Sequence, residues 1–373
     1  MLRSTILLTT RDLRQIVEKV GIHELMDEMI RRLERSLVDY DPQEFSTPAR
    51  AGFTYREPET GLLEWMPTRE SDGKATVNMV GYHPRNPQRV GVPTILSTVT
   101  CYDTKTGHLR GLADATLLTA IRTGAASAVA TRVLANPRRG TLGLVGAGAQ
   151  ALTQLHAISR VLDVERVMLF DVDADVTATF VARAQVLGLQ NVRFDASDPK
   201  AIMREADIVC TCTSNEIGAG PVVEDDETCD WIHVNAVGSD FPGKVELPVS
   251  LLRRSLVCPD FREQAEREGE CQQLLPDEIG PGFVELVKGA KEFASHRNRP
   301  TVFDSTGWSL EDHLAIDMLL QYAEDLGLGT RVEIECIPTD PYNPYALPDE
   351  SKILEIAPPT SDSVRAERRT GHS

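Results

Sequence analysis

A glycine-rich loop is the feature of the sequence that points most directly to chemistry. It consists of Gly146, Ala147, Gly148, Ala149 and Gln150. A short apolar run of strand type precedes it at 141–145, and residues 150–162 continue with helical spacing. Such a strand, loop and helix bring backbone N–H groups and a helix N-terminus close enough to bind a pyrophosphate. Asp171 ends the next apolar run, where a carboxylate can bind a ribose with free hydroxyls, so the pattern predicts bound NAD rather than NADP.

Asp240 is a candidate active-site carboxylate that comes shortly after the apolar run 231–237. Ligands of doubly wound folds bind outside the carboxyl ends of the strands, so a carboxylate at this place faces the cleft expected to hold the nicotinamide ring. The alternative is a loop aspartate that caps a turn, and position alone leaves both open. Thr211 lies in the predicted strand 207–213 and Val237 ends the run 231–237, and we expect both beside the same cofactor.

Two arginines are candidates for binding an anion. Arg122 lies in a helical stretch of very small residues, 117–128, which must pack tightly against another element. An arginine in such a place needs an anionic partner, either a substrate carboxylate or a cofactor phosphate, because an unpaired buried charge is costly. Arg50 is the weaker candidate, because it lies in a loop and loop arginines are usually solvated.

Glu64 and Met66 form a third candidate group in the run 61–67. Strand alternation places both on one face, with Leu63 and Trp65 on the other. A carboxylate beside a thioether on a buried face indicates a recess for a cationic group. A core methionine next to an edge glutamate explains the pattern equally well. Three further glutamates, Glu266, Glu268 and Glu270, indicate a solvated helix end.

Composition limits the kinds of partner that the chain can bind. The 373 residues carry a net charge of −17, which repels nucleic acids and anionic membrane surfaces, so neither is expected as a partner. No apolar run approaches the ~20 residues of a membrane span, and the N-terminus lacks a signal-peptide core. We therefore expect a cytoplasmic protein. Seven scattered cysteines without zinc-type spacing indicate neither disulfides nor a metal site.

The order of the predicted elements indicates two domains. The chain reads as amphipathic helices at 12–37, β-type runs at 61–102, a helix at 115–134, alternating strands and helices from 141, with one element at 251–258, a helix at 310–326 and a β-type run at 331–337. The predicted fold class is α/β, a Rossmann-type doubly wound parallel sheet plus a mixed α+β domain. The expected domains are 1–135, completed by 305–349, and 136–304, followed by a disordered tail at 350–373.

Several motifs together resemble the ornithine cyclodeaminase and mu-crystallin family. They lie at 63–67, 80–87, 117–130, 146–156, 235–248, 268–273 and 302–307. The resemblance covers about Leu8 to about Leu347 and implies a homodimer, with the mixed domain binding an amino-acid substrate and pairing with its partner. It also implies a redox-neutral ring closure. Bound NAD takes a hydride from Cα of a diamino acid, the terminal amine attacks, ammonia leaves, and the hydride returns.

The resemblance also assigns roles to individual residues. It implies that Arg50 and Arg122 bind the substrate carboxylate and that Thr94 lies near this end of the substrate. Glu64 and Met66 line the amine pocket. Asp240 takes part in proton transfer between the reacting amines. Asp171 holds the adenosine ribose.

Asn78 is a departure from the family pattern, which has a lysine here that helps to bind the carboxylate. Asn is neutral, so one charge-assisted contact is missing. Lys74 shares the strand face but lies ~13 Å away at ordinary strand rise, too far to substitute. Three explanations remain open: an engineered inactive form, a natural relative with a changed substrate or reaction, and a compensating cation elsewhere.

The sequence therefore predicts an NAD-dependent amino-acid cyclodeaminase. Conversion of L-lysine to L-pipecolate is preferred, on the resemblance to lysine cyclodeaminases, over conversion of L-ornithine to L-proline. The enzyme alternative is an NAD(P)H-dependent cyclic imine reductase or amino-acid dehydrogenase, which uses the same hydride geometry with net redox change. The alternative outside enzymes is a ligand-binding relative that has lost catalysis, as Asn78 allows. The fold cannot choose among these possibilities.

Overall fold

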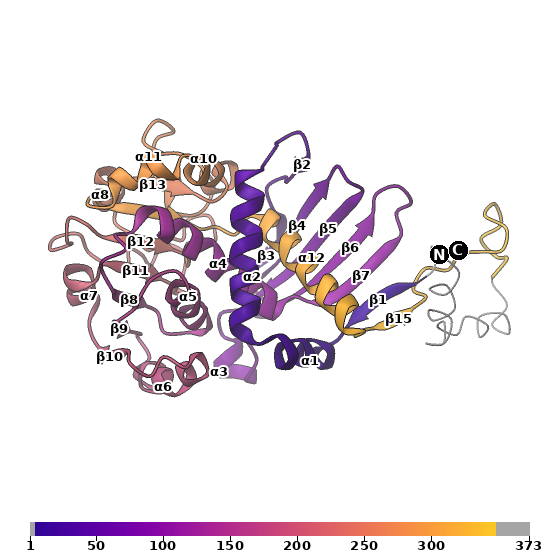
Figure 1. The fold of residues 1–373 in the computed structure, drawn as a ribbon, viewed down its shortest axis with the longest axis horizontal. Coiled ribbons are helices and arrows are strands. Elements are labelled where there is room, and N and C mark those ends of the chain that lie inside the picture. Colours follow the sequence, from indigo (N-terminus) through magenta and orange to yellow (C-terminus); the bar gives the residue numbers. More distant parts are fainter. Residues whose placement is uncertain (1–3, 348–373) are drawn as a thin grey trace, which may run out of the picture.

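The computed structural model describes residues 4–347, which form two sheets with the long helix α2 (Ile22–Val38) standing between them (Figure 1). One sheet has eight strands and the other has seven. The tail expected to be disordered, 350–373, lies outside the described residues. Within 4–347, no helix combines the length and the apolar character needed to cross a bilayer.

The eight-stranded sheet is mostly antiparallel, in the order β15-β1-β7-β6-β5-β4-β2, with β3 paired to β4. Its strands are β1 (Thr5–Leu8), β2 (Phe45–Ser46), β3 (Ala51–Tyr55), β4 (Gly61–Glu70), β5 (Lys74–Tyr82), β6 (Ile95–Asp103), β7 (Leu109–Asp114) and β15 (Thr330–Val332). The predicted run 331–337 does join this sheet, but as the three-residue strand β15, which pairs with β1. Residues from the two ends of the chain therefore complete one sheet.

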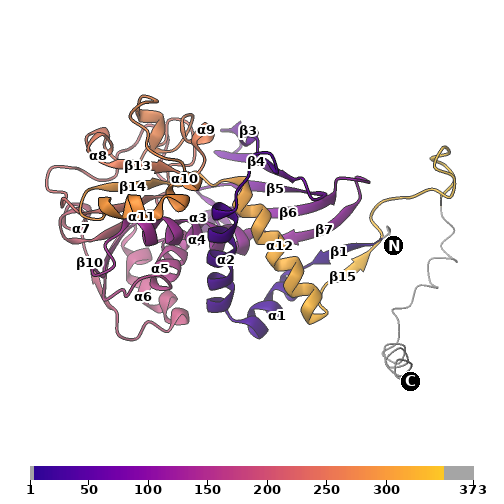
Figure 2. The same ribbon diagram turned by 45° about the horizontal axis from the view of Figure 1, so that its top comes forward.

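Helix α12 (Ser309–Leu326) crosses the inner face of this sheet (Figure 2). The Thr68 hydroxyl donates to Ser309 Oγ at 2.9 Å, and Thr76 Oγ1 lies 3.1 Å from His313 Nδ1. Side chains alternate between the faces of a strand, so positions two residues away from these threonines face the helix as well. Met66 and Asn78 occupy two such positions.

The seven-stranded sheet is parallel throughout, in the order β10-β9-β8-β11-β12-β14-β13. Its strands are β8 (Thr141–Val145), β9 (Arg166–Phe170), β10 (Arg193–Ala196), β11 (Ile208–Thr211), β12 (His233–Ala236), β13 (Leu256–Pro259) and β14 (Thr301–Asp304). The strand order reverses between β8 and β11, which is the switch point where doubly wound folds bind nucleotides. The predicted fold class is confirmed. The single element predicted at 251–258 is wrong, because it divides into helix α8 and strand β13.

The remaining helices connect the strands or cover the two sheets. They are α1 (Thr10–Val20), α3 (Asn86–Val90), α4 (Thr116–Leu134), α5 (Ala149–Ser159), α6 (Ala174–Ala184), α7 (Pro199–Glu205), α8 (Val249–Arg254), α9 (Arg262–Ala265), α10 (Phe283–Lys288) and α11 (Ala290–Phe293), with single 3₁₀ turns at Gln185–Leu187, Glu270–Gln273 and Ala294–His296. Helix α4 is buried along nearly its whole length and shares one core with α2, α10 and α12.

The small residues of α4 allow it to pack closely against α5, the helix that follows the glycine-rich loop. A Cβ atom added at Gly124 would lie 2.8 Å from the Thr153 carbonyl oxygen and 3.2 Å from Ala157 Cβ. Both atoms belong to α5, and the first is backbone that cannot move alone. This contact therefore ties the nucleotide-binding helix to the helix that carries Arg122.

We expect Gly124→Val to lower the free energy of unfolding by about 1–3 kcal/mol, the usual cost of overpacking a core. Valine is the better helix former of the two, so helix propensity would act in the opposite direction. Chemical denaturation measures the change. Gly282→Ala is the control, because a Cβ there meets no atom within 4 Å. Equal stabilities of the two variants would contradict the close packing of α4 on α5.

Candidate active site

Arg50 lies at the centre of a buried cluster of charges. Its Nε is 2.7 Å from Glu268 Oε1, and its Nη1 is 3.3 Å from Glu64 Oε1. Two carbonyl oxygens accept from the same guanidinium, that of Asp240 at 2.5 Å and that of Thr306 at 3.0 Å. Only 8% of the Arg50 side chain is exposed. The expectation that a loop arginine is solvated is wrong, because four segments distant in sequence surround this one.

Arg122 forms the second buried ion-pair group. Its Nη1 donates to Glu311 Oε2 at 2.9 Å, and its Nε donates to Asp312 Oδ1 at 3.1 Å. The turn 306–307 separates the two arginines, because Thr306 accepts from Arg50 while a Cβ at Gly307 would lie 2.8 Å from Arg122 Nη1. Gly307 has a φ of +92°. Arg122 is buried and has anionic partners, but these are two carboxylates of α12. That it binds a substrate carboxylate or a cofactor phosphate stays a prediction.

Asp240 pairs with a buried lysine that the sequence did not single out. Lys244 Nζ donates to Asp240 Oδ1 at 2.9 Å, and the lysine side chain is 4% exposed. The ammonium also lies 5.3 Å from the ring centroid of Tyr82. Burial opposes the charge of Lys244, but the Asp240 carboxylate outweighs it and raises the pKa of the ammonium. The Asp240 side chain itself remains partly open to solvent, as a group that exchanges protons with a ligand must be.

Glu64, Met66 and Asn78 share the inner face of the eight-stranded sheet, as strand alternation predicts for the first two. Met66 and Asn78 are direct cross-strand neighbours, and both are almost fully buried. Asn78 Nδ2 lies 3.4 Å from Thr119 Oγ1, while its Oδ1 is buried without a hydrogen-bond partner among the described residues. The Asn78 amide also contacts the Asp312 carboxylate, so Asn78 lies beside the Arg122 group.

Lys74 does not replace the missing cation at position 78. Its Nζ lies 3.1 Å from Asp317 Oδ1 and 3.3 Å from Glu70 Oε2, at the far end of β5.

Burial raises the pKa of Asp312, and Arg122 and the Asn78 amide oppose that rise. The Arg122 group therefore holds two carboxylates and a neutral amide around one guanidinium.

The protonation of the Arg50 group depends on its burial. Burial raises the pKa of Glu268 to about 7, against the opposing effect of Arg50. It also raises the pKa of Glu64, and Arg50 again opposes the rise. Burial disfavours the charge of Arg50, but Glu64 and Glu268 outweigh it and raise the pKa of the guanidinium. The cation is therefore permanent, while the Glu268 carboxyl group can take up a proton near neutral pH.

The predicted nucleotide residues lie together at the carboxyl edge of the parallel sheet. Gly146 has a φ of +90°, and a Cβ there would lie 2.7 Å from the Cys212 carbonyl oxygen, so only glycine fits this turn. Gly148 precedes the first turn of α5, with Ala149 and Gln150 as the first helical residues, and a Cβ at Gly148 would meet no atom within 4 Å. The N-terminus of α5 therefore faces open space, as pyrophosphate binding requires.

Asp171 lies beside the glycine-rich loop and contacts its backbone. Its carboxylate accepts from the Ala147 N–H at 2.7 Å and from the Asp173 N–H at 2.9 Å. Thr211 ends β11 and Val237 follows β12, so both lie at the same edge as the glycine-rich loop. The residues present fit a dinucleotide: a glycine turn, an open helix N-terminus and an oriented carboxylate.

A framework of buried carboxylates holds the loops at this edge. Glu246 accepts from the N–H groups of Thr213 and Gly238, and Glu270 accepts from those of Glu246 and Leu247. Asp304 in turn accepts from the Glu270 and Cys271 N–H groups. Each carboxylate satisfies backbone donors that strand geometry leaves free. Residues 4–347 contain no group of three or more His, Cys, Asp or Glu side chains arranged to hold a metal ion.

The expectation of a solvated helix end at the three glutamates is therefore wrong for two of them. Glu266 is exposed and pairs with Arg262, as expected. Glu268 instead meets Arg50, and Glu270 is fully buried. Helix α9 ends at Ala265, so Glu268 lies in the loop that follows it, and Glu270 begins a buried 3₁₀ turn. Their membership of a motif shared with the family was the only available signal, because their partners lie elsewhere in the chain.

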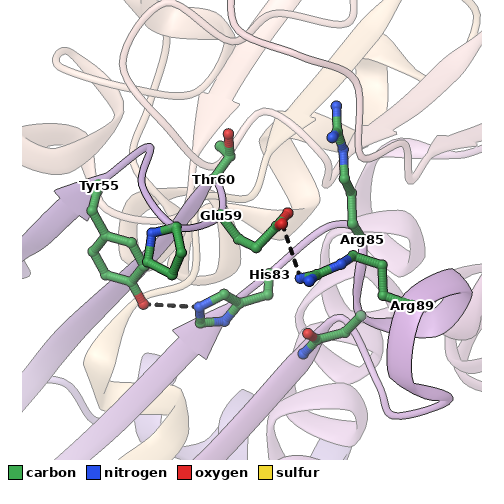
Figure 3. Close-up of a pocket in the computed structure, with 8 residues that line it drawn as sticks. Tyr55, Glu59, Thr60, His83, Arg85 and Arg89 are labelled. Atoms are coloured by element: carbon green, nitrogen blue, oxygen red, sulfur yellow. Dashed lines mark hydrogen bonds and ion pairs between the residues drawn. The ribbon is translucent and has the colours of Figure 1, made fainter.

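Thr94 is not brought together with the arginines. It lies before β6, and its carbonyl accepts from the His83 N–H at 2.8 Å. His83 lines a separate pocket of about 350 Å³ with Tyr55, Glu59 and Arg89 (Figure 3). Tyr55 Oη lies 2.8 Å from His83 Nε2, and Arg89 pairs with Glu59 at 3.2 Å, so the polar groups of this pocket largely satisfy one another.

Comparison with known proteins identifies relatives over nearly the whole chain. The profile of the ornithine cyclodeaminase/mu-crystallin family matches residues 11–325. L-lysine cyclodeaminase of Streptomyces rapamycinicus is 42% identical over 344 residues, which are 92% of this chain and 99% of the relative.

Two solved structures are also similar. The first was described as the structural basis for recognition of L-lysine, L-ornithine and L-2,4-diaminobutyric acid by lysine cyclodeaminase. It is 46% identical, with a TM-score of 0.89, over 92% of this chain and all of that one. An archaeal alanine dehydrogenase dimer with bound NAD is 27% identical, with a TM-score of 0.78, over 89% of this chain and all of that one.

We expect the stability of a Glu268→Gln variant to depend on pH differently from that of the native protein. The pKa of Glu268 rises on folding from its ordinary value of 4.5 to about 7, so the folded state retains a proton that the unfolded state releases. This group therefore stabilises the fold least above about pH 7. Glutamine removes the effect. The free energy of unfolding of the variant, relative to that of the native protein, should therefore rise by up to about 3 kcal/mol from about pH 5 to about pH 8.

Chemical denaturation at the two pH values measures this difference. Glu266→Gln is the matched control, because its side chain is solvated and its effect should be the same at both. An effect of Glu268→Gln that did not change with pH would mean that Glu268 is ionised in the folded protein across this range.

Proposed function

Because the chain belongs to the ornithine cyclodeaminase/mu-crystallin family, we propose that it is an NAD-dependent cyclodeaminase that converts L-lysine to L-pipecolate and ammonia. The observation that carries this proposal is the contact of buried Arg50 with Glu64, Glu268 and the Asp240 carbonyl. These groups meet at the edge of the parallel sheet where nucleotides bind. A diamino acid offers a carboxylate for the guanidinium and an ammonium for the glutamates.

The cofactor of this reaction is NAD. When bound, it accepts a hydride from Cα of the substrate and returns it at the end, so the reaction has no net redox change. Residues 146–150 hold its pyrophosphate with backbone N–H groups at the start of α5, and Asp171 binds the adenosine ribose. Thr211 and Val237 line the nicotinamide end. The relatives that support NAD include the archaeal dehydrogenase whose structure contains it.

The substrate carboxylate binds at the buried arginines. Arg50 already has two carboxylate partners, so a third anion enters only if one of them becomes neutral. Glu268 meets this condition, because burial raises its pKa to about 7. Protonation of Glu268 therefore releases Arg50 for the incoming carboxylate. Glu64 retains its place beside Met66 on the strand and binds the terminal ammonium group.

Asp240 is the group that moves protons during ring closure. The attacking amine must be neutral and the leaving amine must be protonated, so a carboxylate that can reach both nitrogens is required. The side chain of Asp240 is 31% exposed, and Lys244 Nζ lies 2.9 Å from one of its oxygens. This contact leaves the second carboxylate oxygen to serve the substrate nitrogens.

Asn78 favours a second candidate function, in which the same site works with net redox change. Two buried carboxylates share Arg122, and Asn78 adds no positive charge. The alternative is an NAD(P)H-dependent imine reductase or amino-acid dehydrogenase with a changed substrate, and the dehydrogenase relative supports it. L-ornithine as the substrate, or a protein that binds its ligand without turnover, are the remaining possibilities.

We also infer that the protein is a homodimer in which 1–135 and 305–349 bind substrate and pair, while 136–304 hold NAD. The outer face of the eight-stranded sheet supports pairing. Its exposed apolar side chains are Phe53, Leu63, Met79 and Leu96, with exposed fractions of 64%, 39%, 37% and 46%. The register places Phe53 beside Leu63, and Leu96 two strands further on, so these side chains form one surface. A second copy covers this face.

An assay with L-lysine, L-ornithine and catalytic amounts of NAD tests the proposed reaction. We expect release of one ammonia for each lysine consumed, with pipecolate as product and no accumulation of NADH, because the hydride returns to the product. Ammonia is measured by an enzyme-coupled method, and NADH is measured by its absorbance. Formation of one NADH for each lysine consumed would show that the protein is a dehydrogenase and not a cyclodeaminase. A faster reaction with L-ornithine would change the substrate but retain the reaction.

The variant Asn78→Lys tests whether a missing charge limits the reaction. A lysine here reaches the Arg122 group and restores a charge-assisted contact with the substrate carboxylate. Such a contact contributes about 1.5–3 kcal/mol, so we expect kcat/KM for L-lysine to rise roughly 10- to 100-fold. Asn78→Met is the matched control, with similar length and no charge. If both variants lose activity equally, asparagine is adapted to a different substrate or reaction.

A further inference from the structure

The segment after β15 leaves the body of the protein. Residues 337–347, here named the C-terminal arm, extend beyond the edge of the eight-stranded sheet in both views (Figures 1 and 2). The root of the arm is fixed, because Glu335 accepts from the Leu109 N–H at 2.6 Å and pairs with His108. The arm therefore begins at a defined point and direction.

The arm has its own folded structure. The Thr339 N–H donates to the Ala346 carbonyl at 2.9 Å, and the side chains of Asp340 and Asn343 each accept from a backbone N–H two residues later. Among the described residues, every hydrogen bond formed by 339–346 lies within that stretch. The arm contains three prolines, which reduce the number of backbone conformations that it can adopt when unfolded: Pro338, Pro341 and Pro344. The arm is thus ordered without support from the rest of the chain.

This ordered arm displays large side chains to solvent. The exposed fractions are 95% for Tyr342, 89% for Tyr345 and 64% for Leu347. Tyrosines on a preorganised turn lose little conformational entropy when they bind, which is why such residues dominate interfaces. A folded turn that buries neither tyrosine contributes nothing to the core. Its side chains are available for an intermolecular contact.

We propose that the C-terminal arm clasps a second copy of this chain, with Tyr342 and Tyr345 packed on the partner. The inference rests on the proposed homodimer and adds a second contact to it. The arm leaves the β15 edge of the same sheet whose outer face carries Phe53, Leu63, Met79 and Leu96. Phe53 and Leu63 lie near the opposite edge of the sheet, on β3 and β4. When two such faces pair about a twofold axis parallel to the strands, the β15 edge of each copy, and with it the root of its arm, lies beside the β3–β4 edge of the other copy. The archaeal relative is a dimer, which supports a second copy of this chain, and not an unrelated protein, as the partner of the arm.

Photocrosslinking tests where the arm lies. The full-length chain carries a photoreactive phenylalanine in place of Tyr342 and is mixed with heavy-isotope chains before irradiation. We expect crosslinked peptides that join a light arm to a heavy sheet domain. The control places the same group at Val186, which is 61% exposed in the nucleotide-binding part, and should give few products between chains. Crosslinks confined to one chain in a dimeric sample would overturn the proposal.

A pair of variants separates the arm from the dimer itself. Tyr342→Ala with Tyr345→Ala should raise the dimer dissociation constant roughly thirtyfold, the effect of losing hot-spot aromatic side chains. Leu63→Lys with Met79→Lys should prevent pairing of the sheet faces altogether. Sedimentation equilibrium gives both constants, and unchanged NAD binding shows that the chains fold. If the lysine variant is monomeric but the alanine variant dimerises as tightly as the native chain, the arm does not belong to the dimer interface. If the native chain is monomeric at all concentrations, both the arm contact and the homodimer are rejected.

Discussion

The buried guanidinium of Arg50 is the constraint on which the rest of the site depends. It joins the loop before β3 to Glu64 of β4, to the Asp240 carbonyl and to Glu268. A guanidinium cannot lose its proton inside a protein, so the surrounding groups must supply negative charge or carbonyl oxygens. Removing one partner from such a group costs about 3–5 kcal/mol. Arg50 therefore joins the two sheets, and in the proposed reaction a substrate carboxylate would take the place of one of its partners.

Most of the fold was predictable because its signals are local. The strands and helices from 141 onward follow from the alternation of apolar runs and helical spacing, and the glycine-rich loop lies where that alternation places it. Gly146 and Gly148 could be interpreted individually, because a tight turn and an open helix N-terminus each require a small residue. The boundaries at 251–258 and 331–337 were less certain. Helix α8 and strand β15 are short, and pairing with the distant strand β1 decides the extent of β15.

Much of the site was not predictable, because its partners are distant in sequence. The burial of Glu268 depends on Arg50, and that of Glu270 depends on the backbone N–H groups of 246 and 247. A glutamate-rich segment looks solvated when nothing nearby can pair with it. Lys244 was missed for the same reason, since nothing in the sequence separates a buried lysine from a surface one. Neither contact leaves a periodic signal.

The two arginines differ in how they can respond to an anion. Arg50 pairs with Glu268, whose proton affinity allows it to become neutral near pH 7, so this cation can be released for a ligand. Arg122 pairs with two carboxylates of α12 that hold it in the core beside Asn78. A lysine at 78 would satisfy one of those carboxylates and free part of the guanidinium. Asparagine instead leaves its own oxygen unpaired, so Arg122 keeps its ion pairs with both carboxylates of α12. In the proposed reaction the substrate carboxylate would therefore depend on Arg50 more than on Arg122.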